Sequence, residues 1–473
     1  MYGQPSRRAV QTGSVWWEED VPGRFERLAA WEGVTRGTPT RCCWGGVRCT
    51  TEGVAVADVL VGSSRGELQL VEVRLGEGCE SIDGEGRVGV ARQAAVRFTL
   101  EEKNSARRES SSLFGHAQRV TALAHRGAAP AGLPSEASPY VPAPSLFASG
   151  YVDGTLRVYA WSADARQSVE AMDVISVAPQ YPYRPEASAA HPVAAIDWAP
   201  HWAEDALLAW CTGDRWHLGC LATGDASSKG LRVLQTHRLA SASVSAGALS
   251  PSAGLHCVRF HPHGALLAVA GELGIPSVFD LRSGQCVMAM GMLRPTEATT
   301  GAASNTSLKA AHSGRVTALA WHPHGWHLAT GGEDRTACVW DIRRSAGTLA
   351  ALRETSAAVE EEVAAVPRLY GMPAHRAAIS GMAFGATAGT ADTQVPVLLS
   401  SALDGTLRVW QAHTYALHQT IPAGERDGHD VHVVHMDVSG WKTEAGRPAC
   451  IVGCVSPLQR CLRVYGSIPQ RRR

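Results

Sequence analysis

The sequence predicts an all-β fold, a seven-bladed β-propeller, on three observations. A unit of short strand-like runs occurs seven times along the 473 residues. Gly and Pro mark the ends of the runs, and apolar residues show little helical periodicity. A small set of polar and aromatic residues returns at fixed spacing in the clearest copies. Repeats that each contain several short strands build propellers, whereas helical solenoids need a helical period.

The clearest copy spans residues 312–343 and contains strand-like runs at 316–321, 326–331 and 336–340. His-Pro-His-Gly and Glu-Asp-Arg turns separate these runs, as expected for strands joined by tight connections. The other copies have the same order of runs, and the first and last diverge most. They span residues 40–73, 114–159, 190–220, 255–281, 374–410 and 429–465.

The remaining segments give the predicted domain organisation. Residues 1–37 form an N-terminal extension, and part of its segment 15–31 is expected to supply the outer strand of the last blade and so partly close the ring. Residues 38–466 form the propeller, and residues 467–473 form a basic tail. Six insertions rich in Gly, Ala, Ser and Pro are expected to be long irregular surface loops. They span residues 76–110, 127–144, 162–189, 223–253, 293–309 and 345–367.

Three copies share four residues at constant spacing. An Asp stands six residues before an aromatic residue, a Ser or Thr stands four residues before that Asp, and a His lies upstream. The carboxylate can accept from the His, which can bond the hydroxyl, which can reach the aromatic side chain. Such a chain satisfies buried polar groups that would otherwise cost ~1–3 kcal/mol each. The predicted structural tetrads are His116, Ser149, Asp153 and Tyr159; His312, Thr330, Asp334 and Trp340; and His375, Ser400, Asp404 and Trp410.

These sets resemble the structural tetrad of WD40 repeats. The pair Trp340-Asp341 is the Trp-Asp dipeptide typical of that family, and the match is most complete in the fifth copy. The first, third, fourth and seventh copies lack a full set. The resemblance implies blades of four strands and a protein that binds other proteins.

Composition excludes several classes of function. The 44 Lys and Arg residues balance the 44 Asp and Glu residues, so no chain-wide basic field exists to attract nucleic acid. The short runs Arg7-Arg8 and 471–473 are expected to be solvated tails, with nuclear import or RNA contact as the alternative. The first residues do not form a secretory signal, and no apolar run reaches 18 residues. The twelve cysteines contain no C-x-x-C pair. We therefore expect a soluble intracellular protein in a reducing compartment, without zinc.

Two groups of residues suggest a metal site and a hydrolase site, but both groups recur in more than one copy of the repeat, which favours a structural role. The histidines of the two His-Pro-His-Gly turns suggest a metal site, but the turns belong to different copies and are expected to lie apart on the rim as hydrated turns. These residues are His261, His263, His322, His324 and His327. Ser400, His375 and Asp404 resemble a hydrolase triad, yet the same trio recurs in the other tetrads. A nucleophile is needed once, whereas a structural brace is needed in many blades. We expect no catalytic residue, no cofactor, no metal and no small-molecule substrate.

The order of motifs over residues 38–466 resembles the WD40 subunit of the U4/U6 small nuclear ribonucleoprotein, the pre-mRNA-processing factor four family. Leu273 stands where that family has a turn Asp, and the seventh copy lacks a clear Asp and Trp. The N-terminal region of that family, with its small helical motif, is nearly absent. The segments that carry the resemblance are 113–116, 148–158, 281–288, 327–331, 372–375, 401–404 and 436–439.

This resemblance implies a nuclear pre-mRNA splicing factor that acts as a scaffold. It would stabilise the particle by docking on another splicing protein of the U4/U6 particle, and it would meet the U4/U6 small nuclear RNA only indirectly or peripherally. No membrane is involved. The alternative is a WD40 adaptor of another complex: a ubiquitin-ligase substrate receptor, or a chromatin or ribosome-assembly factor. An enzyme that uses the central channel is the third class.

Overall fold

A computed structural model describes the strands of the ring and the turns that connect many of them. The described residues are 22–49, 55–75, 80–82, 88–90, 94–100, 119–126, 145–161, 175–177, 191–200, 206–221, 231–239, 254–295, 306–344, 347–349, 363–366, 368–388, 394–423, 432–442, 448–457 and 460–468. Their regular structure consists of strands, with no helix among them. Accordingly, no helix in this part of the chain is long and apolar enough to cross a membrane.

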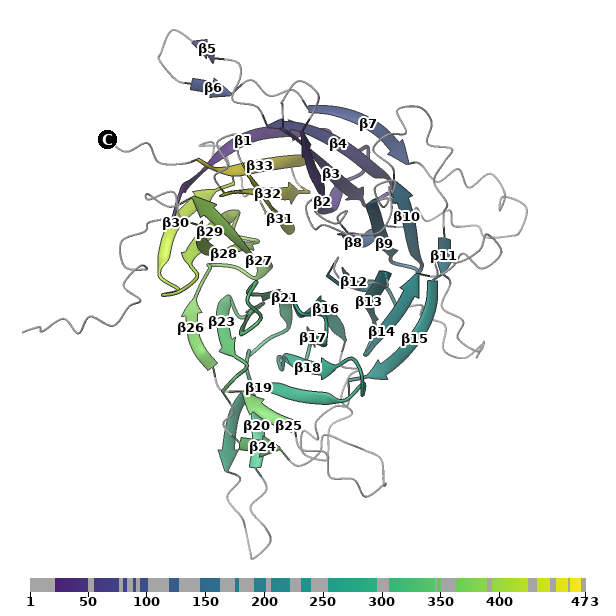
Figure 1. Cartoon of the computed structure of the whole chain (residues 1–473), viewed down its shortest axis with the longest axis vertical. Helices are drawn as coiled ribbons and strands as arrows, with labels where there is room; N and C mark the ends of the chain where they lie inside the picture. Colours follow the sequence, from purple (N-terminus) through teal and green to yellow (C-terminus); the bar gives the residue numbers. More distant parts are fainter. Residues whose placement is uncertain are drawn as a thin grey trace, which may run out of the picture.

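Seven antiparallel blades surround a central channel (Figure 1). This arrangement confirms the predicted seven-bladed propeller. Each blade has four strands, which follow one another outward from the channel, and the first strand of each blade faces the axis.

The blades are built from four concentric sets of strands. The inner strands are β2 (Pro39–Cys49), β8 (Val120–Arg126), β12 (Val193–Trp198), β16 (Leu255–Phe260), β21 (Val316–Trp321), β27 (Ile379–Ala388) and β31 (His435–Lys442). The second strands are β3 (Ala55–Ser63), β9 (Ser145–Tyr151), β13 (Ala206–Thr212), β17 (Leu266–Gly271), β22 (His327–Gly332), β28 (Gln394–Ala402) and β32 (Pro448–Ser456). The third strands are β4 (Leu68–Leu75), β10 (Leu156–Trp161), β14 (Arg215–Leu221), β18 (Ser277–Asp280), β23 (Thr336–Asp341), β29 (Thr406–Gln411) and β33 (Cys461–Ile468). The outer strands are β7 (Ala94–Leu100), β11 (Ile175–Val177), β15 (Leu231–Arg238), β19 (Cys286–Pro295), β26 (Arg368–Pro373), β30 (Leu417–Pro422) and β1 (Arg24–Glu32).

The outer strand of the seventh blade comes from the other end of the chain. Strand β1 pairs antiparallel with β33, with Phe25 opposite Ser467 and Trp31 opposite Leu462. The ring is therefore closed by backbone hydrogen bonds between segments at opposite ends of the sequence.

Several segments that the sequence predicted as irregular loops contain strands. The outer strands β7, β11 and β15 lie inside three of the predicted insertions. An outer strand has one neighbour and faces solvent, so its side chains need not form an apolar pattern. In β15 only the first residue, Leu231, is buried. The segment therefore lacks the apolar pattern of a strand, and its composition predicted a loop.

Further short strands occur outside the seven blades. In the fourth blade, β19 continues beyond the ring and pairs antiparallel with β20 (Thr306–Ala310) and parallel with β25 (Val363–Val366). Strand β24 (Gly347–Leu349) extends this arm, which projects from the ring in Figure 1. Strands β5 (Glu80–Ile82) and β6 (Val88–Val90) form a separate two-stranded pair.

The core is divided among the spaces between neighbouring blades. Seven clusters of buried side chains are present in the described residues, and each joins two successive blades. The cluster with Phe25, Val409 and Val452 joins the sixth and seventh blades, and the one with Trp44, Val59 and Val464 joins the seventh and first. Because apolar burial is the main stabilising term, each blade depends on both neighbours.

Candidate functional site

The fifth-blade tetrad forms a continuous hydrogen-bonded chain. Thr330, on β22, accepts a hydrogen bond from the Trp340 indole Nε1 at 3.0 Å, and its Oγ1 lies 2.7 Å from His312 Nε2. His312 Nδ1 lies 3.1 Å from both carboxylate oxygens of Asp334. The backbone N–H groups of Ser313 and Thr336 also donate to that carboxylate. The chain links the turn before β21 to β22 and β23.

The sixth-blade tetrad has the same connections. The Trp410 indole Nε1 donates to Ser400 Oγ at 3.0 Å, so the Ser400 hydroxyl hydrogen is free to point to His375 Nε2, 2.8 Å away. In this arrangement Nε2 accepts, and the hydrogen on Nδ1 points to Asp404 Oδ2 at 3.3 Å and Thr406 Oγ1 at 3.1 Å. Ser400 is fully buried, and its hydroxyl is hydrogen bonded to the His375 ring and to the Trp410 indole. It is not placed as the exposed nucleophile that a hydrolase requires.

The two tetrad histidines differ in acidity. Burial works to lower the pKa of His312, but its hydrogen bond to Asp334 and the neighbouring Cys338 raise that pKa to about 9. Burial lowers the pKa of His375 to about 4, although the Asp404 carboxylate opposes the change. Two carboxylate oxygens lie near the His312 ring, whereas one, at longer distance, lies near His375. The neighbouring Cys338 also raises the pKa of His312, and the charge of Arg408 lowers that of His375.

The second-blade set is arranged differently. His116 lies outside the described residues. The Ser149 hydroxyl donates to the Tyr151 hydroxyl at 3.2 Å, and the Tyr151 and Tyr159 hydroxyls are 3.4 Å apart. Asp153 is exposed, and its Oδ1 accepts from the backbone N–H of Thr155 at 3.0 Å. Tyr151, which the spacing did not identify, therefore connects Ser149 to Tyr159 in place of a direct bond.

Two blades without a tetrad contain other polar networks. In the first blade, Glu67 Oε2 accepts from the backbone N–H groups of Arg36 and Gly37, at 3.0 and 3.2 Å, and from the Ser63 hydroxyl. In the third blade, the ring of His217 lies between the Thr212 and Thr236 hydroxyls, at 2.9 and 3.0 Å. Their residues do not follow the constant spacing of the tetrads, so these sets could not be predicted from the sequence.

The two His-Pro-His-Gly turns meet, which corrects the expectation that they lie apart. His261 Nε2 is 3.0 Å from the carbonyl oxygen of Gly325 in the next blade. These turns follow the inner strands, where neighbouring blades are most crowded. His322 stacks on His324 with 3.5 Å between ring centroids, and burial lowers the pKa of His322 to about 3. Within the described part of the chain, no three His, Cys, Asp or Glu side chains are placed to hold a metal ion.

The central channel is lined by equivalent positions of all seven inner strands. Six of these strands carry a bulge near their start, and the residue that follows the bulge faces the channel; His435 occupies the same position in β31. These positions line a cavity of about 80 Å³. They are Arg41, Ala122, Ala195, Cys257, Ala318, Gly381 and His435, and we call them the channel ring.

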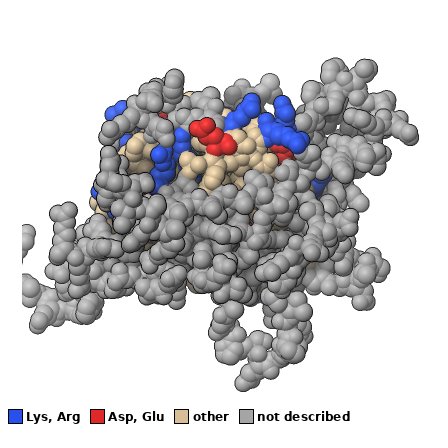
Figure 2. Space-filling model, turned by 90° about the horizontal axis from the view of Figure 1, so that it is seen from above, with Lys and Arg blue, Asp and Glu red and all other residues tan. Residues whose placement is uncertain are grey.

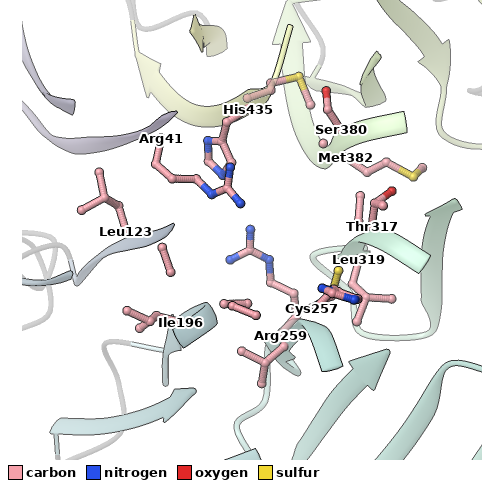
Figure 3. Close-up of a pocket in the computed structure, with 18 residues that line it drawn as sticks. Arg41, Leu123, Ile196, Cys257, Arg259, Thr317, Leu319, Ser380, Met382 and His435 are labelled. Carbon is pink, nitrogen blue, oxygen red and sulfur yellow. The ribbon is translucent and has the colours of Figure 1, made fainter. Parts of the chain in front are cut away.

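Charged side chains meet in this channel. The guanidinium groups of Arg41 and Arg259 point toward one another from opposite sides, next to the His435 ring (Figure 3). Arg259 donates to Asp197 Oδ1 at 3.1 Å, whereas Arg41 donates to the backbone carbonyl of its neighbour Thr40 at 3.0 Å. Burial, followed by the charges of Arg41 and Arg259, lowers the pKa of His435 well below its usual range, which keeps the ring neutral.

Two carboxylates beside the channel tie successive blades together. Asp197 Oδ2 accepts from the backbone N–H of Phe260 at 2.7 Å, and Asp437 Oδ2 accepts from that of Trp44 at 2.9 Å. Burial raises the pKa of both carboxyl groups. Asp197 and Asp437 each lie two residues after the channel-ring residue of their own strand. The same contact between an inner-strand Asp and the next blade therefore occurs in two blades.

Comparison with known proteins gives partial matches. The sequence profile of one family, described as the N-terminal domain of nucleolar protein 10-like proteins, matches residues 238–440. WD repeat-containing protein 1 of Mus musculus is 30% identical over 88 residues, which cover 19% of this chain and 12% of the mouse protein. WD repeat-containing protein VIP3 of Arabidopsis thaliana is 34% identical over 89 residues, 19% of this chain and 26% of the plant protein. The chain thus matches only a small part of either relative's length.

These matches agree with the geometry of the blades. The relatives carry WD repeats by name, and the nucleolar family has a β-propeller domain. The hydrogen-bonded His, hydroxyl, Asp and Trp sets of two blades have the form expected of WD40 repeats. In the ring, in these sets and in the matched segments, the chain is therefore similar to WD40-repeat β-propeller proteins.

Proposed function

We propose that the protein is a non-catalytic scaffold that holds other proteins in a nucleolar assembly. The observation that carries the proposal is the profile match over residues 238–440, because it names a nucleolar protein and spans the blades with the best-formed tetrads. A rigid ring suits a scaffold, since its strands hold the connecting turns in fixed positions and turns make contacts. The most direct role for a nucleolar scaffold is ribosome assembly.

A splicing role in the U4/U6 particle is the second candidate. It is favoured by the motif resemblance, in particular the segments 281–288 and 372–375 that flank the fifth blade. In this role the propeller would dock on a splicing protein that grips the RNA duplex. Other WD40 adaptor roles, in ubiquitin ligation or on chromatin, fit the fold equally but have no further observation in their favour.

Charge supports indirect or peripheral contact with RNA in either role. The whole chain is neutral, so it has no general attraction for a phosphate backbone. Lys and Arg side chains do gather along part of the described edge of the ring, beside fewer Asp and Glu (Figure 2). A local basic surface of this kind can touch RNA that a partner protein has already positioned.

The surface that we assign to partners is the face with the turns between second and third strands, called here the tetrad-turn face. Val152 and Leu403 protrude from two of these turns, each one residue before the turn Asp, and are 45% and 36% exposed. Exposed apolar side chains above a polar turn are suited to protein contact. Val233 and Leu417 are similarly exposed on outer strands and serve as a comparison.

Purification of the tagged full chain from nuclear extract tests the proposal. Recovery of precursor ribosomal RNA and its proteins supports the nucleolar role, recovery of U4 and U6 RNA supports the splicing role, and recovery of ligase or chromatin proteins replaces both. The double variant V152E/L403E should lose the partners, whereas V233E/L417E should retain them. Equal retention by both variants would reject the tetrad-turn face as the partner surface.

A further inference from the structure

We propose that the central channel is a binding site for a carboxylate, supplied by a Glu or Asp side chain of a partner protein. Arg41 and Arg259 would hold the carboxylate between them, and the surrounding channel would exclude larger anions. The proposal rests on the scaffold function, because it specifies how one partner is recognised. It does not depend on which assembly the scaffold belongs to.

The first observation is a difference between the two arginines: Arg259 has carboxylates beside it, whereas Arg41 has none among the described residues. The two guanidinium groups point toward one another across the channel (Figure 3), and a buried cation is costly unless an anion lies beside it. Arg259 donates to Asp197, and, against the effect of burial, the charges of Asp197 and Asp437 raise its pKa. Arg41 makes its described hydrogen bond to a backbone carbonyl and has no carboxylate partner among the described residues. Burial, and then the charge of Arg119, lower the pKa of Arg41, as expected for a cation that lacks an anion.

The second observation is the position of this cation within the repeat. Of the seven channel-ring residues, Arg41 alone carries a charge at neutral pH, since His435 is kept neutral and the others are Ala, Cys or Gly. Small residues at five of the seven positions leave open space in front of the guanidinium. The cavity of about 80 Å³ is ample for a small polar group, because one water needs about 10–15 Å³ on this measure.

The third observation concerns the size and charge of the anion. Asp197 and Asp437 lie close to Arg259 and hold backbone N–H groups of neighbouring blades, so they cannot move away from an entering anion. They favour a singly charged carboxylate over a doubly charged phosphate. Leu123, Ile196 and Met382 add apolar walls that fit the methylene groups of a Glu or Asp side chain.

Arg41 lies at the end of the channel nearest the tetrad-turn face. Arg41 pairs with Gly62 near the end of β3, immediately before the turn at Ser64 and Arg65 on that face. An acidic residue in an exposed loop of a partner can therefore enter beside the turns while neighbouring partner residues contact Val152 and Leu403. The bidentate geometry of a guanidinium suits a carboxylate at this point.

Binding of short peptides to the purified full chain tests the site. The probe is a fluorescein-labelled nine-residue peptide of alternating Gly and Glu, compared with the same peptide carrying Gln or phosphoserine in place of Glu. Fluorescence anisotropy should show binding of the Glu peptide and none of the Gln peptide. R41Q should weaken binding ~10-fold or more, as removal of a charged hydrogen-bond donor does. R41K should retain part of it.

Two further variants make the result specific. R376Q removes an exposed Arg from the same face and should leave binding within about 2-fold, since exposed charges contribute little. A122E places a carboxylate in the channel ring beside Arg41; it should block the peptide and raise the melting temperature. An equal loss in R376Q, tighter binding of the phosphoserine peptide, or no binding of the Glu peptide would each overturn the proposal. Recovery of the nuclear assembly alongside such a result would reject the channel site and leave the scaffold function in place.

Discussion

The carboxylate of Asp437 and the backbone of Trp44 are hydrogen bonded, although the two residues are 393 positions apart in the sequence. Asp437 Oδ2 accepts from Trp44 N at 2.9 Å, and the Trp44 indole Nε1 donates to the backbone carbonyl of Asp437 at 3.1 Å. These bonds join the inner strands of the seventh and first blades, beside the closure made by β1 and β33. The ring is therefore fastened at both its inner and its outer edge.

Replacement of Asp437 by Ala should weaken the closed ring. The change leaves the Trp44 N–H without its acceptor in a buried position, so unfolding should become easier by ~1–3 kcal/mol. Urea unfolding followed by tryptophan fluorescence measures the difference. D153A is the control, because Asp153 is exposed and accepts a hydrogen bond from Thr155 within its own turn. Equal stability of D437A and the parent would mean that this contact does not hold the ring.

Asp334→Ala tests the fifth-blade tetrad. Asp334 accepts from His312 and from two backbone N–H groups, so its loss leaves several buried donors unsatisfied and should cost ~1–3 kcal/mol. Differential scanning calorimetry should show a lower melting midpoint for D334A and D404A than for D153A. An unchanged midpoint in D334A would contradict a bracing role for the tetrad.

Gly274→Ala should be more harmful than Gly33→Ala. Both glycines have positive φ, +67° and +66°, so both variants carry similar backbone strain. A Cβ on Gly274 would also lie 2.5 Å from the backbone carbonyl oxygen of His312, whereas a Cβ on Gly33 meets nothing within 4 Å. The additional clash should cost ~1–3 kcal/mol. Thermal unfolding of the two variants measures this additional cost. Similar melting midpoints would show that the backbone at His312 moves to accommodate the Cβ.

The two tetrad histidines should titrate on opposite sides of neutrality. The pKa of His312 is raised to about 9 and that of His375 lowered to about 4. The folded chain therefore holds its His312 proton more tightly than the unfolded chain, and that stabilisation is lost as pH rises from about 6.5 through about 9. His375 resists protonation, so its stabilisation is lost as pH falls from about 6.5 through about 4.

Nuclear magnetic resonance of the chain labelled with ¹⁵N at histidine checks this difference, with H312Q and H375Q to assign the signals. Chemical unfolding across the same pH range should show stability lost on both sides of about pH 6.5 to 7. In H375Q the acid-side loss should shrink. Titration of both rings near 6.5 would contradict the assigned environments.

The strands that face the core could be predicted from sequence, and those that face solvent could not. The inner, second and third strands are apolar runs set off by Gly and Pro, as in 316–321 and 336–340. The outer strand β15 has a mostly exposed surface, and its pairing with β14 uses backbone groups that any residue supplies. Composition therefore places such a strand among the loops.

The polar sites divide in the same way. The tetrads of the fifth and sixth blades could be predicted because their residues are close in sequence and recur at one spacing. The pair Arg41 and Arg259 could not, since the two residues come from the first and fourth blades and only the closed ring turns both side chains into one channel. Alignment of the bulged positions across blades would have isolated Arg41 as the one cation among small residues. The contact between His261 and Gly325 also depends on blade packing that a linear pattern does not contain.

The pairing of β1 with β33 has a consequence for synthesis of the protein. The first strand of the ring emerges from the ribosome long before its partner, and Phe25 then lacks the neighbours that bury it in the finished molecule. Until the last blade has been translated, the Phe25 side chain and the unpaired edge of β1 remain exposed. Exposed apolar side chains and unpaired strand edges favour aggregation. Shielding by a chaperone during that interval would matter most for β1.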